Sequence, residues 1–150
     1  NDFQTLIIKA CLQVDCAPIA PDWFFEMTPV DFLAAAIAKI SDNVANLGQV
    51  YNVVQQDPVR AEDVFTRMRD TGLIRELVPM TEWRLRLETV SDSANDVELK
   101  LLARSLDSVE GYLTDTSVYD TSRFNEASLQ MGLVPPPVDV DYVTMFLRGQ

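Results

Sequence analysis

A regular spacing of apolar residues runs through the segment TPVDFLAAAIAKISDNVANLGQVYNVVQQDP, from Thr28 to Pro58. Alternating steps of four and three residues, typical of one face of an α-helix, separate Leu33, Ile37, Ile40, Val44, Leu47, Tyr51 and Val54. Thr28 and Pro29 are typical of a helix start, and Pro58 indicates a helix end. The pattern predicts one long helix over residues 29–56. The side chains predicted to be buried along it are Leu33, Ile37, Ile40, Val44, Leu47 and Val54.

Three further segments show helical spacing, over residues 58–71, 94–114 and 122–131. Gly72 and Gly132 follow the first and the third of them, as expected of residues that end a helix in the left-handed conformation. These segments are shorter than the predicted helix over residues 29–56. That difference suggests that part of the long apolar face contacts another protein chain.

Two segments, residues 2–14 and 82–90, fit more than one pattern. In the first, apolar residues match both a helical stripe and one face of a strand, and in the second Trp83, Leu85 and Leu87 alternate with charged residues. We favour helix for both, because Asp2 can cap a helix in the first segment and a strand in the second could pair only with residues 5–14. The alternative is a small two-stranded element that pairs residues 5–14 with residues 83–90.

The C-terminal segment begins with three consecutive prolines, Pro135 to Pro137, which favour a stiff, extended spacer. Residues 135–150 are therefore predicted to form an arm with a short apolar helix that docks on a neighbouring subunit, or alternatively on its own chain. Residues 1–134 are predicted to form a single helical domain. The candidate interface residues are Val140, Val143, Phe146, Leu147, Tyr51 and Val54.

These elements predict an all-α fold, an irregular bundle of five to seven helices around the helix over residues 29–56. The chain has 150 residues, which suits one domain with a sizeable core. Its longest unbroken apolar run, from Phe32 to Ala38, is far shorter than the roughly 20 residues of a membrane helix.

The net charge of the chain limits the classes of molecule that it is expected to bind. There are 12 basic and 23 acidic residues, a net charge of −11, which disfavours direct binding to nucleic acid or to an anionic membrane. The expected partners are proteins: further copies of the chain or other subunits of a complex. The arginines between residues 60 and 86 lie among similar numbers of acidic residues, so we expect them to form local ion pairs.

Cys11 and Cys16 have a C-x4-C spacing, which does not match redox or zinc motifs. We expect free, buried thiols, and hence a reducing compartment such as the cytoplasm, or the interior of an assembled particle. The sequence has no histidine, the commonest ligand of transition metals and the commonest general base at neutral pH. No metal site is therefore predicted.

The motifs of common catalytic and nucleotide-binding sites are missing. Neither G-x-G-x-x-G nor G-x-x-x-x-G-K occurs, and a triad that needs histidine is impossible. No catalytic or cofactor-binding residue and no cofactor is predicted. The sequence thus favours a non-enzymatic structural or assembly protein, a subunit of a multi-copy complex such as a virus particle. The alternatives are a small acidic regulator that binds a basic surface, as a nucleic-acid mimic or inhibitor, and an enzyme using carboxylates, Lys or Tyr.

Overall fold

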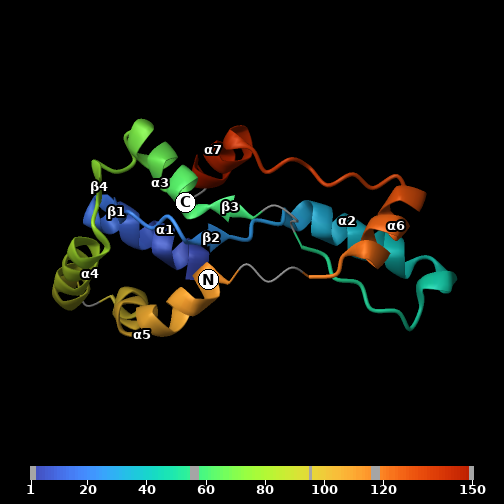
Figure 1. Cartoon of the computed structure of the whole chain (residues 1–150), viewed down its shortest axis with the longest axis horizontal. Coiled ribbons are helices and arrows are strands. Elements are labelled where there is room, and N and C mark those ends of the chain that lie inside the picture. Colours follow the sequence, from blue (N-terminus) through green and yellow to red (C-terminus); the bar gives the residue numbers. More distant parts are fainter. Residues whose placement is uncertain (1–2, 55–57, 95, 116–118, 149–150) are drawn as a thin grey trace.

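The computed structural model describes residues 3–54, 58–94, 96–115 and 119–148, and it has an elongated shape made of two bodies (Figure 1). The larger body holds most of the helices and two small sheets, and the smaller body holds α2 and α6. The described helices are α1 (Phe3–Val14), α2 (Val30–Ser41), the 3-10 turn η1 (Val44–Asn46), α3 (Ala61–Asp70), α4 (Met80–Ala94), α5 (Val97–Thr114), α6 (Ser122–Gln130) and α7 (Val140–Arg148).

Two short sheets connect the helices of the larger body. Strand β1 (Cys16–Pro18) pairs in parallel with β4 (Glu76–Val78), and β2 (Phe24–Phe25) pairs antiparallel with β3 (Val59–Arg60). The prediction of a mostly helical chain is confirmed at this coarse level, whereas the alternative of a two-stranded element that pairs residues 5–14 with residues 83–90 is wrong. The two segments with ambiguous patterns are the helices α1 and α4, and the strands lie in the connections between helices.

The core of the larger body lies around α1. Ile7, Ile8 and Cys11 are fully buried, and α1 contacts α4, α5 and β1. Aromatic rings pack edge to face on this core, with centroids 6.3 Å apart for Trp23 and Trp83. Edge-to-face pairs of this kind add roughly 0.5–1.5 kcal/mol to the burial of the rings themselves.

The predicted helix over residues 29–56 is wrong, because α2 ends at Ser41. The hydroxyl of Ser41 donates to the carbonyl oxygens of Ile37 and Ala38, at 2.8 and 3.0 Å. The side-chain amide of Asn46 donates from Nδ2 to the carbonyl of Ile40 at 3.1 Å. These side chains add to the backbone bonds at the helix end, where Asp42 N donates to the carbonyl of Ala38 at 3.1 Å and Asn43 N donates to that of Ile40 at 3.4 Å. Further along, Gly48 has a φ of 76°.

The predicted burial along this segment fails with the helix. Ile37, Val44 and Leu47 have exposed fractions of 59%, 79% and 63%. The other three residues predicted to be buried, Leu33, Ile40 and Val54, are only half-buried. Residues 50–54 form neither helix nor strand, and the predicted end of the long helix at residues 55 and 56 falls outside the described residues.

The other predicted helices are present, and two of them begin three residues later than predicted. Helix α3 begins at Ala61 because Val59 and Arg60 pair with β2, and α5 begins at Val97 after the N-cap Asp96. Gly72 and Gly132, with φ values of 75° and 63°, follow α3 and α6 as predicted. The residue after each glycine donates a backbone hydrogen bond to the last turn of the helix, for example from Leu73 N to the carbonyl of Met68 at 2.9 Å.

Helix α7 docks on its own chain, the alternative considered from the sequence. It packs against α3, where Arg67 Nε donates to Thr144 Oγ1 at 2.9 Å, and Val143 and Leu147 belong to the core. The segment with the three prolines leads from α6 back to the larger body (Figure 1). The domain division after residue 134 and docking of this arm on another subunit stay predictions.

Cys11 and Cys16 are free and buried, as predicted. Burial raises the pKa of the Cys11 thiol well above its ordinary value, with a further contribution from Cys16. Burial also raises the pKa of Cys16, although the nearby Arg86 opposes this effect. Both side chains are therefore uncharged thiols at neutral pH, and the thiol form is a poor nucleophile.

The isoleucines of α1 and α2 give a matched test of the packing. In this chain, Ile7→Ala should lower the free energy of unfolding by about 2–5 kcal/mol, because it leaves a cavity in the core. Ile37→Ala should change it by less than about 0.5 kcal/mol, because its side chain is exposed. Denaturant unfolding followed by circular dichroism measures both values. Equal losses would contradict the described position of α2.

The thiols give a second test. The folded chain should not react with a thiol-specific disulfide reagent near pH 8, whereas both thiols should react in denaturant. Stability should fall as the pH rises above 9.0, the ordinary pKa, because the unfolded chain then releases thiol protons that the folded chain retains. Unfolding measured from pH 8 to 10 should show a weaker decline for Cys11→Ala. An unchanged decline would show that Cys11 does not contribute to it.

Candidate functional site

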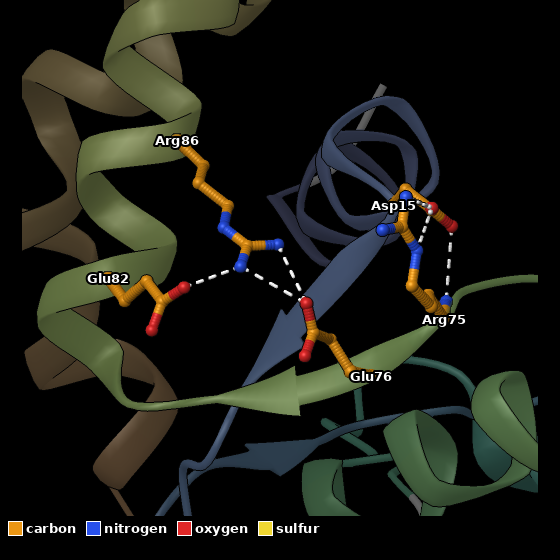
Figure 2. A network of polar contacts seen from close by, with 5 residues as sticks. All are labelled: Asp15, Arg75, Glu76, Glu82 and Arg86. Carbon is orange, nitrogen blue, oxygen red and sulfur yellow. Dashed lines mark hydrogen bonds and ion pairs between the residues drawn. The ribbon is translucent and has the colours of Figure 1, made fainter.

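A network of polar contacts lies where β1 and β4 meet α1 and α4 (Figure 2). Asp15 connects α1 to β1 and has a φ of 55°, in the left-handed region that Asp tolerates better than most residues. This turn directs the chain from the helix into the parallel pair, in which Cys16 lies opposite Glu76. The local backbone thus brings two carboxylates, Asp15 and Glu76, to neighbouring positions.

Asp15 holds the start of β4. Its carboxylate accepts hydrogen bonds from the backbone N of Arg75 at 3.1 Å and from Arg75 Nε and Nη2 at 3.0 and 2.8 Å. The two residues are 60 positions apart in the sequence. A guanidinium that binds both oxygens or one oxygen through several N–H groups fixes geometry better than a single contact does.

Arg86 of α4 joins the network from the other side. Its Nη1 and Nη2 both donate to Oε1 of Glu76 at 3.1 Å, and Nη2 also donates to Glu82 one turn earlier in α4. Hydrogen bonds to Glu82 and then to Glu76 raise the pKa of the Arg86 guanidinium above its ordinary value. Arg86 therefore stays a cation that links α4 to β4, although water screens such partly exposed ion pairs and they stabilise the fold little.

A shallow hollow of about 340 Å³ lies beside this network, between the end of α1 and α4. Its lining includes Gln13, Asp15, Leu85, Arg86, Thr89 and Val90. Asp15 and Arg86 already bind partners of opposite charge, and Thr89 donates to the carbonyl of Leu85 at 2.8 Å. The hollow therefore offers charged and apolar contacts. Its two charged side chains, Asp15 and Arg86, are both held in ion pairs, so neither is placed to act as a general acid or base.

No group of three or more His, Cys, Asp or Glu side chains able to hold a metal ion occurs in the part of the chain that the structure describes. The sequence anticipated local ion pairs among the arginines, and Arg86 with Glu82 is such a pair. It did not indicate Arg75 with Asp15, because no spacing rule connects residues so far apart. The parallel pairing of β1 and β4 that creates this contact has no signal in either three-residue strand.

The candidate interface residues do not form one site. Val143 and Leu147 are buried in the core of the larger body, and Phe146 is half-buried against it. Tyr51 and Val54 lie in the irregular segment after η1, where the Tyr51 hydroxyl donates to Oδ1 of Asn46 at 3.0 Å. The side chain of Val140 is outside the described ones. Contacts of these residues with another protein chain stay a prediction.

Within the described ranges, no helix combines the length and the apolar composition that crossing a membrane requires. The compartment of the protein stays a prediction.

No model of a known protein family matches the chain. Several curated relatives are enzymes. The non-canonical nonribosomal peptide synthetase hkm10 of Aspergillus hancockii is 30% identical over 111 residues, 69% of this chain and 10% of the relative. The nonribosomal peptide synthetase asaC of Aspergillus flavus is 25% identical over 123 residues, 80% of this chain and 12% of the relative. The glycine betaine reductase ATRR of Emericella nidulans is 29% identical over 82 residues, 55% of this chain.

A solved structure matches almost the whole fold. The crystal structure of the terminal R domain from the myxalamid PKS-NRPS biosynthetic pathway has a TM-score of 0.79 and 28% identity to the chain. The match covers 98% of this chain and 37% of that one. The chain thus spans about a third of this solved domain, and 6–12% of the first curated relatives.

These similarities correct the function expected from the sequence. The sequence predicted a structural or assembly protein, such as a subunit of a virus particle, or alternatively an acidic regulator, and it predicted that the chain is not an enzyme. These predictions are contradicted, because the relatives are biosynthetic enzymes. The absence of catalytic motifs in 150 residues was a poor guide, since a segment of a large enzyme can lack them. The similarities point instead to a domain of a peptide-synthetase or reductase enzyme.

Proposed function

We propose that this chain is the substrate-binding portion of a reductase domain in an enzyme related to nonribosomal peptide synthetases. The observation that carries the proposal is the structural match to a terminal R domain over 98% of the chain, with a TM-score of 0.79. The similarity to a glycine betaine reductase supports reduction as the reaction. The substrate class would be a carboxyl-derived group of an amino acid or peptide.

A reductase needs a hydride donor, commonly a nicotinamide dinucleotide. The residues of this chain do not fit such a group, because the sequence lacks the G-x-G-x-x-G loop that lets a backbone approach a pyrophosphate. The described glycines with positive φ, Gly48, Gly72 and Gly132, follow helices or helical turns instead. We therefore assign the donor site to the part of the domain outside this chain.

If the donor site lies in the other part of the domain, binding of the substrate is the role left for this chain. The larger body supplies a rigid, close-packed support, and the hollow beside Arg86 and Asp15 supplies charged and apolar contacts on its surface. The first partner in this proposal is the remainder of the same enzyme. We retain protein partners, in preference to nucleic acid or membrane, because of the net charge of −11. A cytoplasmic location is retained for the two free thiols.

Neighbouring leucines of α5 provide the functional test in the complete enzyme. Leu102 is fully buried and Leu101 is 57% exposed. Leu102→Asp should lower substrate-dependent oxidation of a nicotinamide donor at least tenfold, because an unpaired buried carboxylate disrupts the packing of the larger body. Leu101→Asp should retain activity within about threefold, in keeping with the small effects of most surface substitutions.

The readouts are donor oxidation at 340 nm with amino-acyl or peptidyl thioesters, and donor binding by fluorescence. Donor binding should survive Leu102→Asp if the donor site lies elsewhere. No donor oxidation by the unmodified enzyme with any such substrate would contradict the reductase assignment. Loss of donor binding in Leu102→Asp, with the rest of the enzyme folded, would contradict the proposed division between the two portions.

A further inference from the structure

Helix α2 is apolar on nearly all sides, which is typical of a helix that is covered all round. Its polar residues are Asp31, Lys39 and Ser41. Yet Ala36 is its one buried residue in the structure. By contrast, α1 has the same length of 12 residues and buries six of them. Helix α2 therefore has the composition of a core helix and the exposure of a surface helix.

Helix α6 covers one side of α2. Phe32 and Phe124 pack edge to face with ring centroids 6.0 Å apart, and Lys39 Nζ donates to the carbonyl of Met131 at 3.2 Å. The opposite side is bare, and the turn of about 100° per residue places its members together. We call this side the bare face of α2, and it consists of Val30, Ala34, Ala35, Ile37 and Ala38.

The bare face suits contact with protein. Val30 and Ile37 are 79% and 59% exposed, and the three alanines leave room for close approach of a neighbour. Asp31 is the one charged side chain on this side of the helix. Depletion of charge is the composition expected at the centre of an interface. The exposure continues beyond the helix, since Val44 and Leu47 are 79% and 63% exposed.

The segment from Val50 to Val54, with the sequence VYNVV, adds a second and independent feature. Three valines and a tyrosine give it the composition of a β-strand, yet it forms no strand. No backbone-to-backbone hydrogen bond from this segment occurs among the described residues. Side chains hold it in place: Arg123 donates to the carbonyl of Val50 at 3.3 Å, and Asn52 donates to the carbonyl of Asp120 at 3.0 Å.

A stretch of this composition with no backbone partner among the described residues is a template for pairing with another strand. In a domain like the solved R domain, such a strand would come from the part that this chain does not match. The solved domain matches 98% of this chain, whereas the matched residues are 37% of that domain. The rest of a comparable domain would lie against some surface of this chain. The bare face and the segment Val50–Val54 lie close together in the sequence, and Figure 1 shows α2 in the smaller body, away from the core around α1.

We propose that the bare face of α2 and the segment Val50–Val54 are the surface at which this chain joins the remainder of its reductase domain. The segment pairs with the edge of a sheet in that remainder, and α2 packs on the face of the same sheet. Main-chain pairing provides affinity in such strand addition, and side chains on alternate positions provide specificity. This inference rests on the proposed function, because that function implies that a remainder exists.

Amide hydrogen exchange tests the pairing directly. We expect the amides of Val50–Val54 to exchange at least 100-fold more slowly in the complete enzyme than in the 150-residue chain alone. The amides of α1 serve as the internal control, since they should be protected in both. Fast exchange of Val50–Val54 in the complete enzyme, with α1 protected, would overturn the proposal.

Charge substitutions test the bare face. In the complete enzyme, Ile37→Glu should lower the melting temperature of the reductase domain and increase exchange at Val50–Val54. The matched control is Leu101→Glu, at a side chain of the larger body that is 57% exposed, and it should change neither. Equal effects of the two variants would overturn the proposal. So would a dimer of the 150-residue chain that Ile37→Glu dissociates while the complete enzyme is unaffected, because the occupant would then be a second copy.

These outcomes are separable from those of the proposed function. Donor oxidation with fast exchange at Val50–Val54 would reject the joining surface and keep the reductase. Slow exchange at Val50–Val54 without donor oxidation would keep the joining surface and reject the reductase.

Discussion

The burial of α1 is the constraint on which the larger body depends. Ile7 and Ile8 are adjacent in the sequence and both fully buried, so α1 is covered on more than one side. Helices α4 and α5 and strand β1 provide that cover. The left-handed turn at Asp15 then leads the chain directly into the β1 and β4 pair, and Arg75 binds the carboxylate of the same residue. The packing of α1 and the polar network around Arg75 and Arg86 therefore both depend on how α1 ends at Asp15.

Local signals predicted much of this fold, and the failures have local causes too. Helices α3, α5 and α6 were predictable because their apolar spacing and the residues that end them lie within the same stretch of sequence. The long helix over residues 29–56 failed because an apolar period says nothing about competing side chains. Ser41 and Asn46 bond to carbonyls of the last turn, and the chain leaves the helical path after Ser41 although the apolar spacing continues.

The site was less predictable than the fold. The ion pair of Arg86 with Glu82 lies within one helix and follows from spacing, whereas Asp15 and Arg75 meet only because β1 and β4 pair in parallel. Function was predicted wrongly for a different reason. The missing histidine and glycine-rich loop argued against an enzyme, but they argue only about the chemistry that this segment performs by itself. A domain can divide donor and substrate between two stretches of chain.

The small contact between α2 and α6 affects the order in which parts of the protein fold and unfold. Lys39 and Met131, which meet there, are 92 residues apart, so pairing the two helices closes one of the longest loops of the chain. Closure entropy rises with loop length, and the few buried residues of the smaller body offset little of it. The smaller body should thus form after the larger one during folding and open before it during local unfolding. Partial opening of this kind would separate the helices while leaving the core around α1 intact.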